Sequence, residues 1–330
     1  MNPAFVDLIT ESQRFLLCGH EHPDGDCLGS QAAMFHLLRA RGKQVHIINP
    51  DPMSPGYGFL RDHAPFDADR AGTPLPKVDV VVLLDCAELG RLGAMGPKVR
   101  AAGATIAVVD HHVGSEDADG SVCLVDHTAP STGCLVYELF QEFDVEVPRP
   151  AAEGILLSLV ADTGWFRYSN ADARALAIAT RMVECGARLS EMYDAMFRRN
   201  HPDSVVLLTE ALATARIELE GRYAMACLSK GMMDRASRIG FDTDAVLEPL
   251  RSIRGVEVVG LFKERFDGSV KLSLRAKGDV NVQAIATVFG GGGHVKAAGA
   301  EVIGPPPHAQ RLVLEQVRAA LSAAAVDRRP

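Results

Sequence analysis

Short apolar runs, separated by helical segments, constrain the fold of this chain more than any other feature. In the first half they are Phe15–Gly19, Val45–Ile48, Val78–Leu84 and Thr105–Val109. Their apolar character is nearly continuous, which is typical of strands buried on both faces of a parallel sheet. An amphipathic helix is expected between the first two runs, over Leu28–Arg41, and Gly42 supplies its C-cap. The sequence therefore predicts an α/β fold with a parallel sheet.

The pattern changes in the second half. Residues 149–219 read as mostly helical, and strands then alternate with helices again at a different spacing. The expected strands are Tyr223–Leu228, Val256–Lys263 and Val270–Ala276, and the expected helices are Asp244–Ile253, Val282–Phe289 and His308–Ala324. A chain of 330 residues is also long for one core. We expect a first domain over residues 1–200, a helical connector over residues 201–219 and a smaller α/β domain over residues 220–330.

Charge is distributed unevenly along the chain, which has a net charge of −8. Residues 1–215 contain 17 Lys and Arg against 29 Asp and Glu, whereas residues 216–330 contain 17 against 13. Long nucleic acids are held largely by neutralisation of their phosphates, so an acidic first domain argues against such a partner. The same acidic domain suits a cluster of carboxylates that binds divalent cations.

Cysteine usage and hydropathy indicate the compartment. The seven cysteines form no Cys-x-x-Cys pair and are expected to be reduced thiols. The apolar runs are too short to cross a bilayer, and the N-terminal residues lack the basic and apolar regions of a signal peptide. We expect a cytoplasmic protein with no membrane partner. The sequence leaves the oligomeric state open, with a homodimer as one option.

Four polar clusters follow predicted strands or a helix. They are His20-Glu-His-Pro-Asp24-Gly-Asp26, then Asp85, then Asp110-His111-His112, and lastly Asp162. Loops at the carboxyl ends of neighbouring parallel strands meet in one crevice, so these clusters are expected to meet in space. A lone Asp such as Asp85 is more often a turn residue, but four clusters in this order favour a shared site.

The chemistry of such a site is restricted. Asp24, Asp26, Asp85 and Asp162 cannot all stay ionised a few ångströms apart without cations, and two divalent ions would balance their charge. Oxygen ligands with a minority of imidazoles suit Mn²⁺ or Mg²⁺ better than structural zinc, which prefers thiolates. Two such ions activate water and bind phosphoryl oxygens. The sequence therefore predicts a two-metal site for Mn²⁺ or Mg²⁺.

The motifs HEHPDGDCLGS, DCAE, VVDHH, ADTG and GGGGHVKAAGA together resemble the DHH phosphoesterase superfamily, of the nanoRNase and phosphoadenosine-phosphate phosphatase type. The resemblance covers nearly the whole chain. It implies a catalytic first domain, a substrate-binding C-terminal domain and an active site in the cleft between them. It also implies that one metal is held by His20, Asp24 and Asp85, and the other by Asp26, Asp85, His111 and Asp162. Asp110 would orient the histidine pair, and His112 would contact the substrate phosphate or protonate the leaving oxygen.

Residues of the C-terminal half are expected to hold the substrate. Arg275 and Lys277 lie two apart on a predicted strand and would share a face, which without further context is an ordinary solvated face. Glycines let backbone N–H groups approach a phosphate closely. The resemblance implies that the two basic residues and the loop Gly291, Gly292, Gly293 and His294 bind substrate, with Arg275 stabilising the developing charge.

Two further features stay open at this stage. Ser131 precedes the predicted helix Cys134–Phe143, where it is either a simple N-cap or a contact for a substrate phosphate. Trp165, Phe166 and Tyr168 follow Asp162 closely and are either core residues or a stacking surface for a base.

The resemblance implies a metal-dependent hydrolase that acts on short RNA or DNA oligonucleotides of two to five residues. Linear dinucleotides such as pGpG or pApA and 3′-phosphoadenosine 5′-phosphate (pAp) are included. A manganese inorganic pyrophosphatase shares the histidine and aspartate pattern, and a single-strand exonuclease belongs to the same superfamily. The glycine loop disfavours the first, and the acidic surface and two-domain length disfavour the second. A non-catalytic nucleotide-binding module would be indicated by a lost ligand, and every ligand position is filled.

Overall fold

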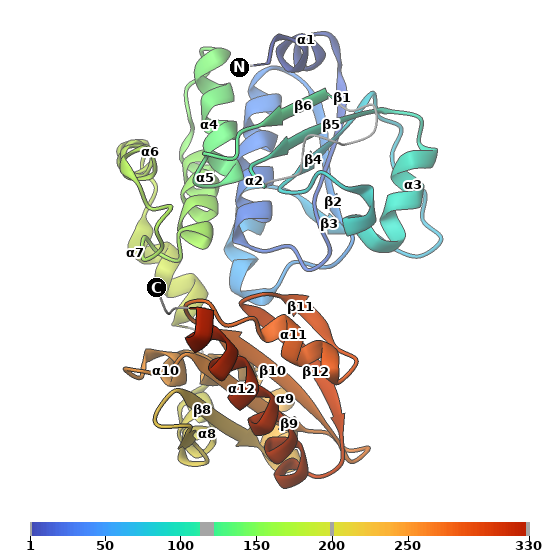
Figure 1. Cartoon of the computed structure of the whole chain (residues 1–330). Coiled ribbons are helices and arrows are strands. Elements are labelled where there is room, and N and C mark those ends of the chain that lie inside the picture. The colour runs from blue at the N-terminus through green and yellow to red at the C-terminus, as the bar shows by residue number, and fades with distance from the viewer. Residues whose placement is uncertain (1, 113–121, 199–200, 328–330) are drawn as a thin grey trace. The chain divides into compact units, whose positions relative to one another are not determined.

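The computed structural model describes residues 2–112, 122–198 and 201–327, and the chain divides into two compact units, Met1–Arg199 and Asn200–Pro330 (Figure 1). Each unit has its own six-stranded sheet with buried residues on both faces. Among the described residues, no helix combines the length and apolarity needed to span a membrane.

The sheet of the first unit is entirely parallel, as predicted. Its strands lie in the order β3-β2-β1-β4-β5-β6, with β1 and β4 at the centre. Their bounds are β1 Arg14–Cys18, β2 Gln44–Asn49, β3 Phe66–Ala68, β4 Val80–Leu84, β5 Thr105–Asp110 and β6 Val122–Val125. The edge strands β3 and β6 were not predicted, because runs of three and four residues are too short to give a pattern.

Successive residues of the central strands face two different cores, which explains why the strands are apolar throughout. Phe15 and Leu17 pack with α2 (Gly25–Ala40), α4 (Thr132–Glu142) and α5 (Arg149–Asp162), whereas Leu16 and Cys18 pack with η2 (Leu89–Met95) and α3 (Gly96–Ala101). These helices lie on opposite sides of the sheet in Figure 1. The first core also includes residues of α1 (Pro3–Glu11), η1 (Pro55–Asp62), α6 (Ala173–Glu184) and α7 (Leu189–Phe197).

Helices α2 and α5 approach each other closely through a pair of glycines. A Cβ on Gly29 would lie 2.3 Å from the carbonyl oxygen of Gly154, and a Cβ on Gly154 would lie 2.6 Å from that of Gly29. Both distances are shorter than real carbon–oxygen contacts, so neither position has room for a side chain. The contact sets the spacing of two helices that carry Asp26 and Asp162.

The second unit contains a mixed sheet with the order β11-β12-β10-β9-β8-β7. Strands β8 and β9 are parallel, and the other described pairs are antiparallel. Helices α11 and α12 pack on one face and α8, η4 and α10 on the other, with α9 beside α8. The bounds are α8 Pro202–Ala213, β7 Arg216–Glu218, β8 Tyr223–Leu228, α9 Lys230–Ile239, η4 Thr243–Val246, α10 Leu247–Ser252, β9 Val258–Glu264, β10 Ser269–Ala276, α11 Val282–Val288, β11 Gly292–His294, β12 Ala297–Ile303 and α12 Pro306–Asp327.

The segment expected as a connector, residues 201–219, consists of α8 and β7 and belongs to the second unit. Ala211 of α8 is fully buried in a core that includes Leu228 and Leu261. Strand β7 pairs with β8 at the edge of the sheet. A helix that buries apolar side chains in this way is part of a domain and not a free linker.

Replacing Gly29 with Ala should destabilise the first unit, because the added methyl group must push α2 and α5 apart. Overpacking of a core costs about 1–3 kcal/mol, and thermal or urea unfolding would measure the loss. Gly231→Ala is the matched control, since Gly231 also lies in a helix and a Cβ there would meet nothing nearer than the Ser229 hydroxyl, at 3.9 Å. Equal unfolding midpoints for the two variants would contradict the tight contact.

Candidate metal centre

The predicted ligands lie at the carboxyl-terminal ends of strands in the first sheet. Strands β1, β4 and β5 are neighbours, and each is followed directly by polar residues that were singled out from the sequence. His20 follows β1, Asp85 follows β4, and His111 follows β5. Asp162 arrives from another direction, as the last residue of α5. The parallel sheet brings these strand ends together, as expected for an open α/β sheet.

Asp24 and Asp26 are placed by the start of α2. Asp24 is the N-cap, and its Oδ1 accepts hydrogen bonds from the backbone N–H groups of Asp26 and Cys27 at 3.0 and 3.2 Å. Asp26 is completely buried. Its Oδ1 accepts a 2.5 Å hydrogen bond from the hydroxyl of Ser158, and its Oδ2 accepts a 3.0 Å bond from the N–H of Thr132. Asp26 is therefore held rigidly.

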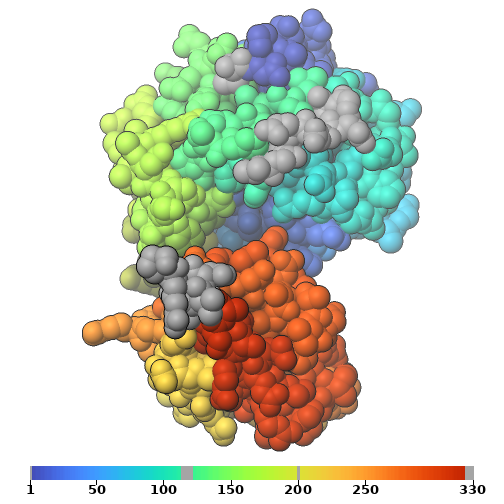
Figure 2. All heavy atoms as spheres, in the orientation of Figure 1, coloured from blue at the N-terminus to red at the C-terminus, as the bar shows by residue number. Residues whose placement is uncertain are grey.

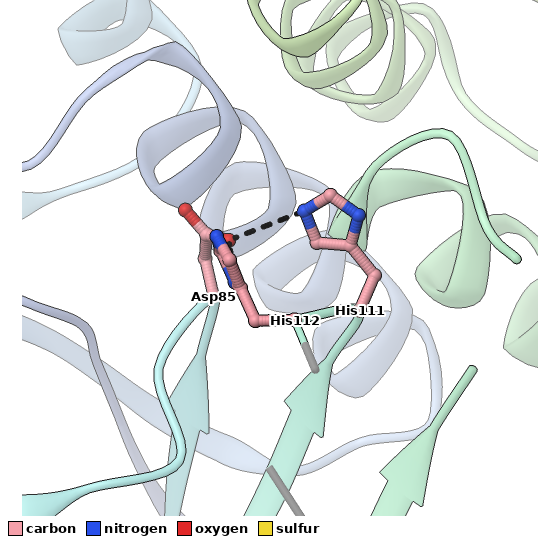
Figure 3. Close-up of side chains that lie close together, drawn as sticks. All are labelled: Asp85, His111 and His112. Carbon is pink, nitrogen blue, oxygen red and sulfur yellow. Dashed lines mark ion pairs between the residues drawn. The ribbon is translucent and has the colours of Figure 1, made fainter. Parts of the chain in front are cut away.

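Asp85 occupies a backbone conformation that is unusual for a residue with a side chain. Its φ is +62°, in the left-handed region, where Asp is tolerated better than most residues. This turn ends β4 and brings the buried carboxylate among the other ligands. Its Oδ2 lies 3.4 Å from Nε2 of His20, and its Oδ1 accepts a 3.2 Å hydrogen bond from the hydroxyl of Thr132. Figure 3 shows His111 and His112 beside this carboxylate.

His111 faces three carboxylates. Its Nε2 lies 2.9 Å from Oδ2 of Asp162, 3.3 Å from Oδ2 of Asp26 and 3.8 Å from Oδ1 of Asp85. Its other ring nitrogen, Nδ1, lies 3.1 Å from the carbonyl oxygen of Ala129. A carbonyl only accepts, so Nδ1 carries a proton and donates it there. In the neutral ring the lone pair is therefore on Nε2, which points at the carboxylates.

The geometry around His111 fits a metal ion. Nε2 is buried and has no hydrogen-bond partner of acceptable geometry. A lone pair facing carboxylate oxygens is repulsive unless a cation lies between them. Without a metal, a proton must take this place. Burial disfavours the charged ring, but Asp162 and Asp26 outweigh that effect and raise the pKa of His111 to about 11. A positive charge therefore lies at this position in both cases, as a bound metal ion or as the proton on His111.

Among the described residues, three groups of side chains offer ligand atoms within 4.8 Å of one another. The group of Asp85, His111 and His112 shares Asp85 with a second group and His111 with a third. A metal bound by one group would therefore lie next to a metal bound by another. The groups are Asp85, His111 and His112; His20, Asp24 and Asp85; and Asp26, His111 and Asp162.

Burial and neighbouring carboxylates raise the pKa values of acidic groups in the site. Burial raises the pKa of Asp85 well above its usual value, and the Asp26 and Asp24 carboxylates add to this shift. Burial also raises the pKa of Asp162, although the His111 ring 2.9 Å away opposes the shift. These shifts mean that the metal-free centre resists ionisation, and divalent cations would remove that penalty.

Asp110 holds the second histidine of the pair. It is buried, and its Oδ1 accepts hydrogen bonds from the backbone N–H groups of His111 and His112 at 2.7 and 3.2 Å. The same oxygen lies 2.8 Å from Nδ1 of His112. This hydrogen bond outweighs partial burial and raises the pKa of His112. The side chain of His112 is 49% exposed, so a substrate can reach it.

Sequence reasoning missed the residues that support the carboxylates. Ser158 donates to Asp26, and Thr132 bonds both Asp26 and Asp85. Ser158 is a lone polar residue in the apolar stretch Ile155–Val160, and that interruption is a signal that could have identified it. Ser131 occupies the N-cap position of α4 without a capping hydrogen bond from its hydroxyl. It is fully buried, and its hydroxyl contacts that of Ser158 at 2.8 Å.

The predicted substrate-binding residues of the second unit are only partly together. Arg275 lines a shallow pocket with Gly292 and Gly293. Lys277 does not line this pocket, because β10 ends at Ala276 and the alternation of faces ends with it. Its ammonium donates to the carbonyl of Ile253 at 3.4 Å. His294 ends β11 and is exposed.

Comparison with known proteins is consistent with this geometry. The model of the DHH family N-terminal domain matches residues 14–161, and that of the DHHA1 domain matches residues 227–324. The chain is 31% identical to the bifunctional oligoribonuclease and PAP phosphatase NrnA of Thermus thermophilus, over 92% of this chain and 89% of that protein. The chain belongs to the DHH family. The resemblance inferred from the motifs is therefore confirmed, and the chain is an enzyme of the phosphoesterase class.

Solved structures show the same fold. An exopolyphosphatase-related protein from Bacteroides fragilis is 22% identical and superposes with a TM-score of 0.85 over 97% of both chains. RecJ from Thermus thermophilus, solved in complex with Mn²⁺, is 16% identical with a TM-score of 0.52, over 96% of this chain and 54% of that one. Both share the DHH architecture with this protein.

Asp85→Asn should weaken metal binding and hydrolysis while the protein stays folded. In wild-type protein, Mn²⁺ at 100 times its dissociation constant should add about 2.7 kcal/mol to stability, and the thermal midpoint should rise. The variant should show a smaller rise, because Asp85 belongs to two of the three ligand groups. Its kcat should fall by more than tenfold, which corresponds to a barrier increase of more than about 1.4 kcal/mol.

The matched control for that experiment is Asp67→Asn, which changes an exposed carboxylate on β3 of the same sheet. This variant should respond to Mn²⁺ as the wild type does. An Asp85→Asn protein with the full Mn²⁺ shift and more than a tenth of the activity would show that Asp85 is no ligand.

Proposed function

We propose that this protein hydrolyses phosphate esters of short oligonucleotides, from two to five nucleotides, with two divalent metal ions, Mn²⁺ in the first place. Linear dinucleotides and pAp are included. The observation that carries the proposal is a pair of adjacent ligand groups, one of His20, Asp24 and Asp85 and one of Asp26, His111 and Asp162. Nε2 of His111 in the second group lies 3.8 Å from Oδ1 of Asp85 in the first. The name of the Thermus thermophilus relative, an oligoribonuclease and PAP phosphatase, supports the substrate class.

The metal ligands in this proposal are His20, Asp24, Asp26, Asp85, His111 and Asp162. The ions, when bound, activate water for attack on phosphorus and offset the charge of the phosphoryl oxygens. The protein's own contribution is to hold the ligands in place before the ions arrive. Ser158 and Thr132 hold the carboxylates of the ligands Asp26 and Asp85, and we assign Ser131 to the same supporting role because its hydroxyl is buried against Ser158.

His112 is the proton donor in this proposal. Nδ1 of its ring is committed to Asp110, so Nε2 is the nitrogen that meets the substrate. The hydrogen bond to Asp110 raises the pKa of His112, which favours the protonated form of the ring. That proton would go to the leaving oxygen of the ester, and Asp110 would stabilise the orientation of the ring throughout.

Arg275 binds a substrate phosphate in this proposal. Its guanidinium donates to Oδ2 of Asp244 at 2.9 Å, and Lys263 donates to Oδ1 of the same carboxylate at 2.5 Å. Two cations share one anion, so the group keeps a net positive charge. Lys271 also lines the pocket beside Arg275. An anion is therefore the expected ligand of this pocket.

Gly292 of the glycine loop also supports the assignment of this pocket to the substrate. Gly291 has a steric reason to be glycine, since a Cβ there would lie 2.1 Å from the carbonyl oxygen of Gly299. Gly292 has open space around its Cβ position and no positive φ. The fold thus places no demand on Gly292, and close approach of a ligand explains the glycine. We keep Gly291–His294 and Lys277 as proposed substrate-binding residues.

The substrate-length assay tests the function most directly. Labelled dinucleotide, pentanucleotide and twenty-mer, together with pAp and pyrophosphate, should be compared with Mn²⁺ present. We expect kcat/KM to peak at two to four nucleotides and to fall with length, because residues 1–215 carry far more acidic than basic residues and offer a long strand few cation contacts. Processive digestion of the twenty-mer would indicate an exonuclease, and dominant pyrophosphate hydrolysis would indicate a pyrophosphatase.

Arg275→Ala should lower kcat/KM for a dinucleotide by about tenfold or more, because a charge-assisted hydrogen bond to a phosphate contributes about 1.5–3 kcal/mol. The metal content of the purified protein should not change. Arg238→Ala is the matched control, since Arg238 is an exposed arginine paired with Asp234 on α9. Loss of metal in Arg275→Ala would show that the residue acts on the metal centre instead.

A further inference from the structure

Three aromatic side chains of the first unit form a cluster that the proposed chemistry does not use. The ring of Trp165 contacts Tyr193 edge to face with centroids 5.0 Å apart, and Phe197 with centroids 5.5 Å apart. Tyr193 and Phe197 lie 4.9 Å apart on α7 and are 41% and 44% exposed. We call Trp165, Tyr193 and Phe197 the aromatic cluster. Residues of α6 and α7, yellow-green in Figure 2, form part of the visible surface of the first unit.

The turn that presents Trp165 is held in a conformation that aromatic residues rarely adopt. Gly164, Trp165 and Phe166 have φ angles of +55°, +59° and +61°, so two bulky residues in succession lie in the left-handed region. The N–H of Trp165 donates to the carbonyl of Val160 at 2.7 Å, and that of Phe166 donates to the hydroxyl of Thr163 at 3.2 Å. Backbone strain that the surroundings hold in place is concentrated at functional sites.

Trp165 of the aromatic cluster lies three residues after Asp162, a proposed metal ligand. Thr163 alone separates Asp162 from the strained turn, and the carboxylate of Asp162 contacts His111. On the other side, α7 reaches η1, where a Cβ on Gly56 would lie 3.9 Å from the carbonyl oxygen of Met196. Tyr57 of η1 lies beside the start of α2, because a Cβ on Gly25, between Asp24 and Asp26, would lie 3.4 Å from Cε1 of the Tyr57 ring.

Cationic groups accompany the rings. The guanidinium of Arg198 lies 5.7 Å from the ring centroid of Tyr193, and that of Arg167 lies 5.9 Å from the centroid of Tyr168. Surfaces that combine aromatic rings with arginines bind bases of single-stranded nucleic acids, because every base has a π-face and every nucleotide carries a phosphate.

We propose that Trp165, Tyr193 and Phe197 form a stacking subsite for one nucleobase of the substrate, next to the metal centre. The proposal rests on the function proposed above and adds the part of the substrate that these residues recognise. The ligand is the base of a mono- or dinucleotide, and purines are favoured over pyrimidines because they stack with a larger area. The subsite would act on binding and would not touch the reacting atoms.

Fluorescence of Trp165 tests binding without catalysis. The chain contains one tryptophan, so the signal reports on this cluster alone. With Mn²⁺ present, AMP should change the fluorescence in a saturable manner, and ribose 5-phosphate, which has the same phosphate and sugar without a base, should not. An equal response to both compounds, or no response to AMP, would overturn the proposal.

Kinetics test the same subsite with substrate. Trp165→Leu should raise KM for a purine dinucleotide by about tenfold, the scale of one lost stack, with little change in kcat. KM for a dinucleotide that lacks one base should stay the same, and Trp165→Phe should restore most of the affinity. Leu176→Ala, which changes an exposed apolar residue on α6, is the matched control. If Trp165→Leu does not fold, the same KM measurements on Tyr193→Leu and Phe197→Leu test the subsite.

The outcomes separate the two proposals. Wild-type protein that does not hydrolyse dinucleotides would refute the proposed function, and the response to AMP would still decide whether a base binds here. Hydrolysis with an unchanged KM in all three variants would overturn the stacking subsite alone. A changed oligomeric state of Trp165→Leu with an unchanged KM would assign the surface to a second copy and would also overturn it.

Discussion

Repulsion between carboxylates is the constraint on which the site depends. Asp26, Asp85 and Asp162 all face Nε2 of His111, and Asp85 is almost entirely buried. Bringing these groups together costs free energy unless cations compensate. The structure resists their separation at several points: the glycine contact between α2 and α5, the hydroxyl of Ser158, the backbone of Thr132 and the left-handed turn at Asp85. The fold thus keeps a site ready for positive charge.

The two units divide the chemistry according to charge. Acidic residues exceed basic ones over residues 1–215, and basic residues exceed acidic ones over residues 216–330. Carboxylates and imidazoles that suit divalent ions belong to the first unit, and the pocket with Arg275 and Lys271 belongs to the second. Metal ions and cationic side chains can both stabilise charge on phosphoryl oxygens, so each unit offers one kind of proposed contact.

Much of this arrangement could be predicted from sequence because its signals are local. The apolar runs predicted the parallel sheet, and the polar residues that follow them predicted which strand ends would meet. The edge strands β3 and β6 were missed because they are too short to show a pattern. The supporting roles of Ser158 and Thr132 depend on the packing of α2, α4 and α5, and such contacts between distant residues have no periodic signal. Lys277 was expected beside Arg275 from strand alternation, but β10 ends one residue too early.

The number of metal ions per chain is the most direct test of the account. Titration of metal-free protein with Mn²⁺, followed by calorimetry and by electron paramagnetic resonance, measures both stoichiometry and the coupling between ions. Two ligand groups that meet where His111 lies 3.8 Å from Asp85 predict two ions per chain with a spin-coupled spectrum at saturation. One ion per chain with full hydrolytic activity, or two ions without magnetic coupling, would contradict a shared two-metal centre.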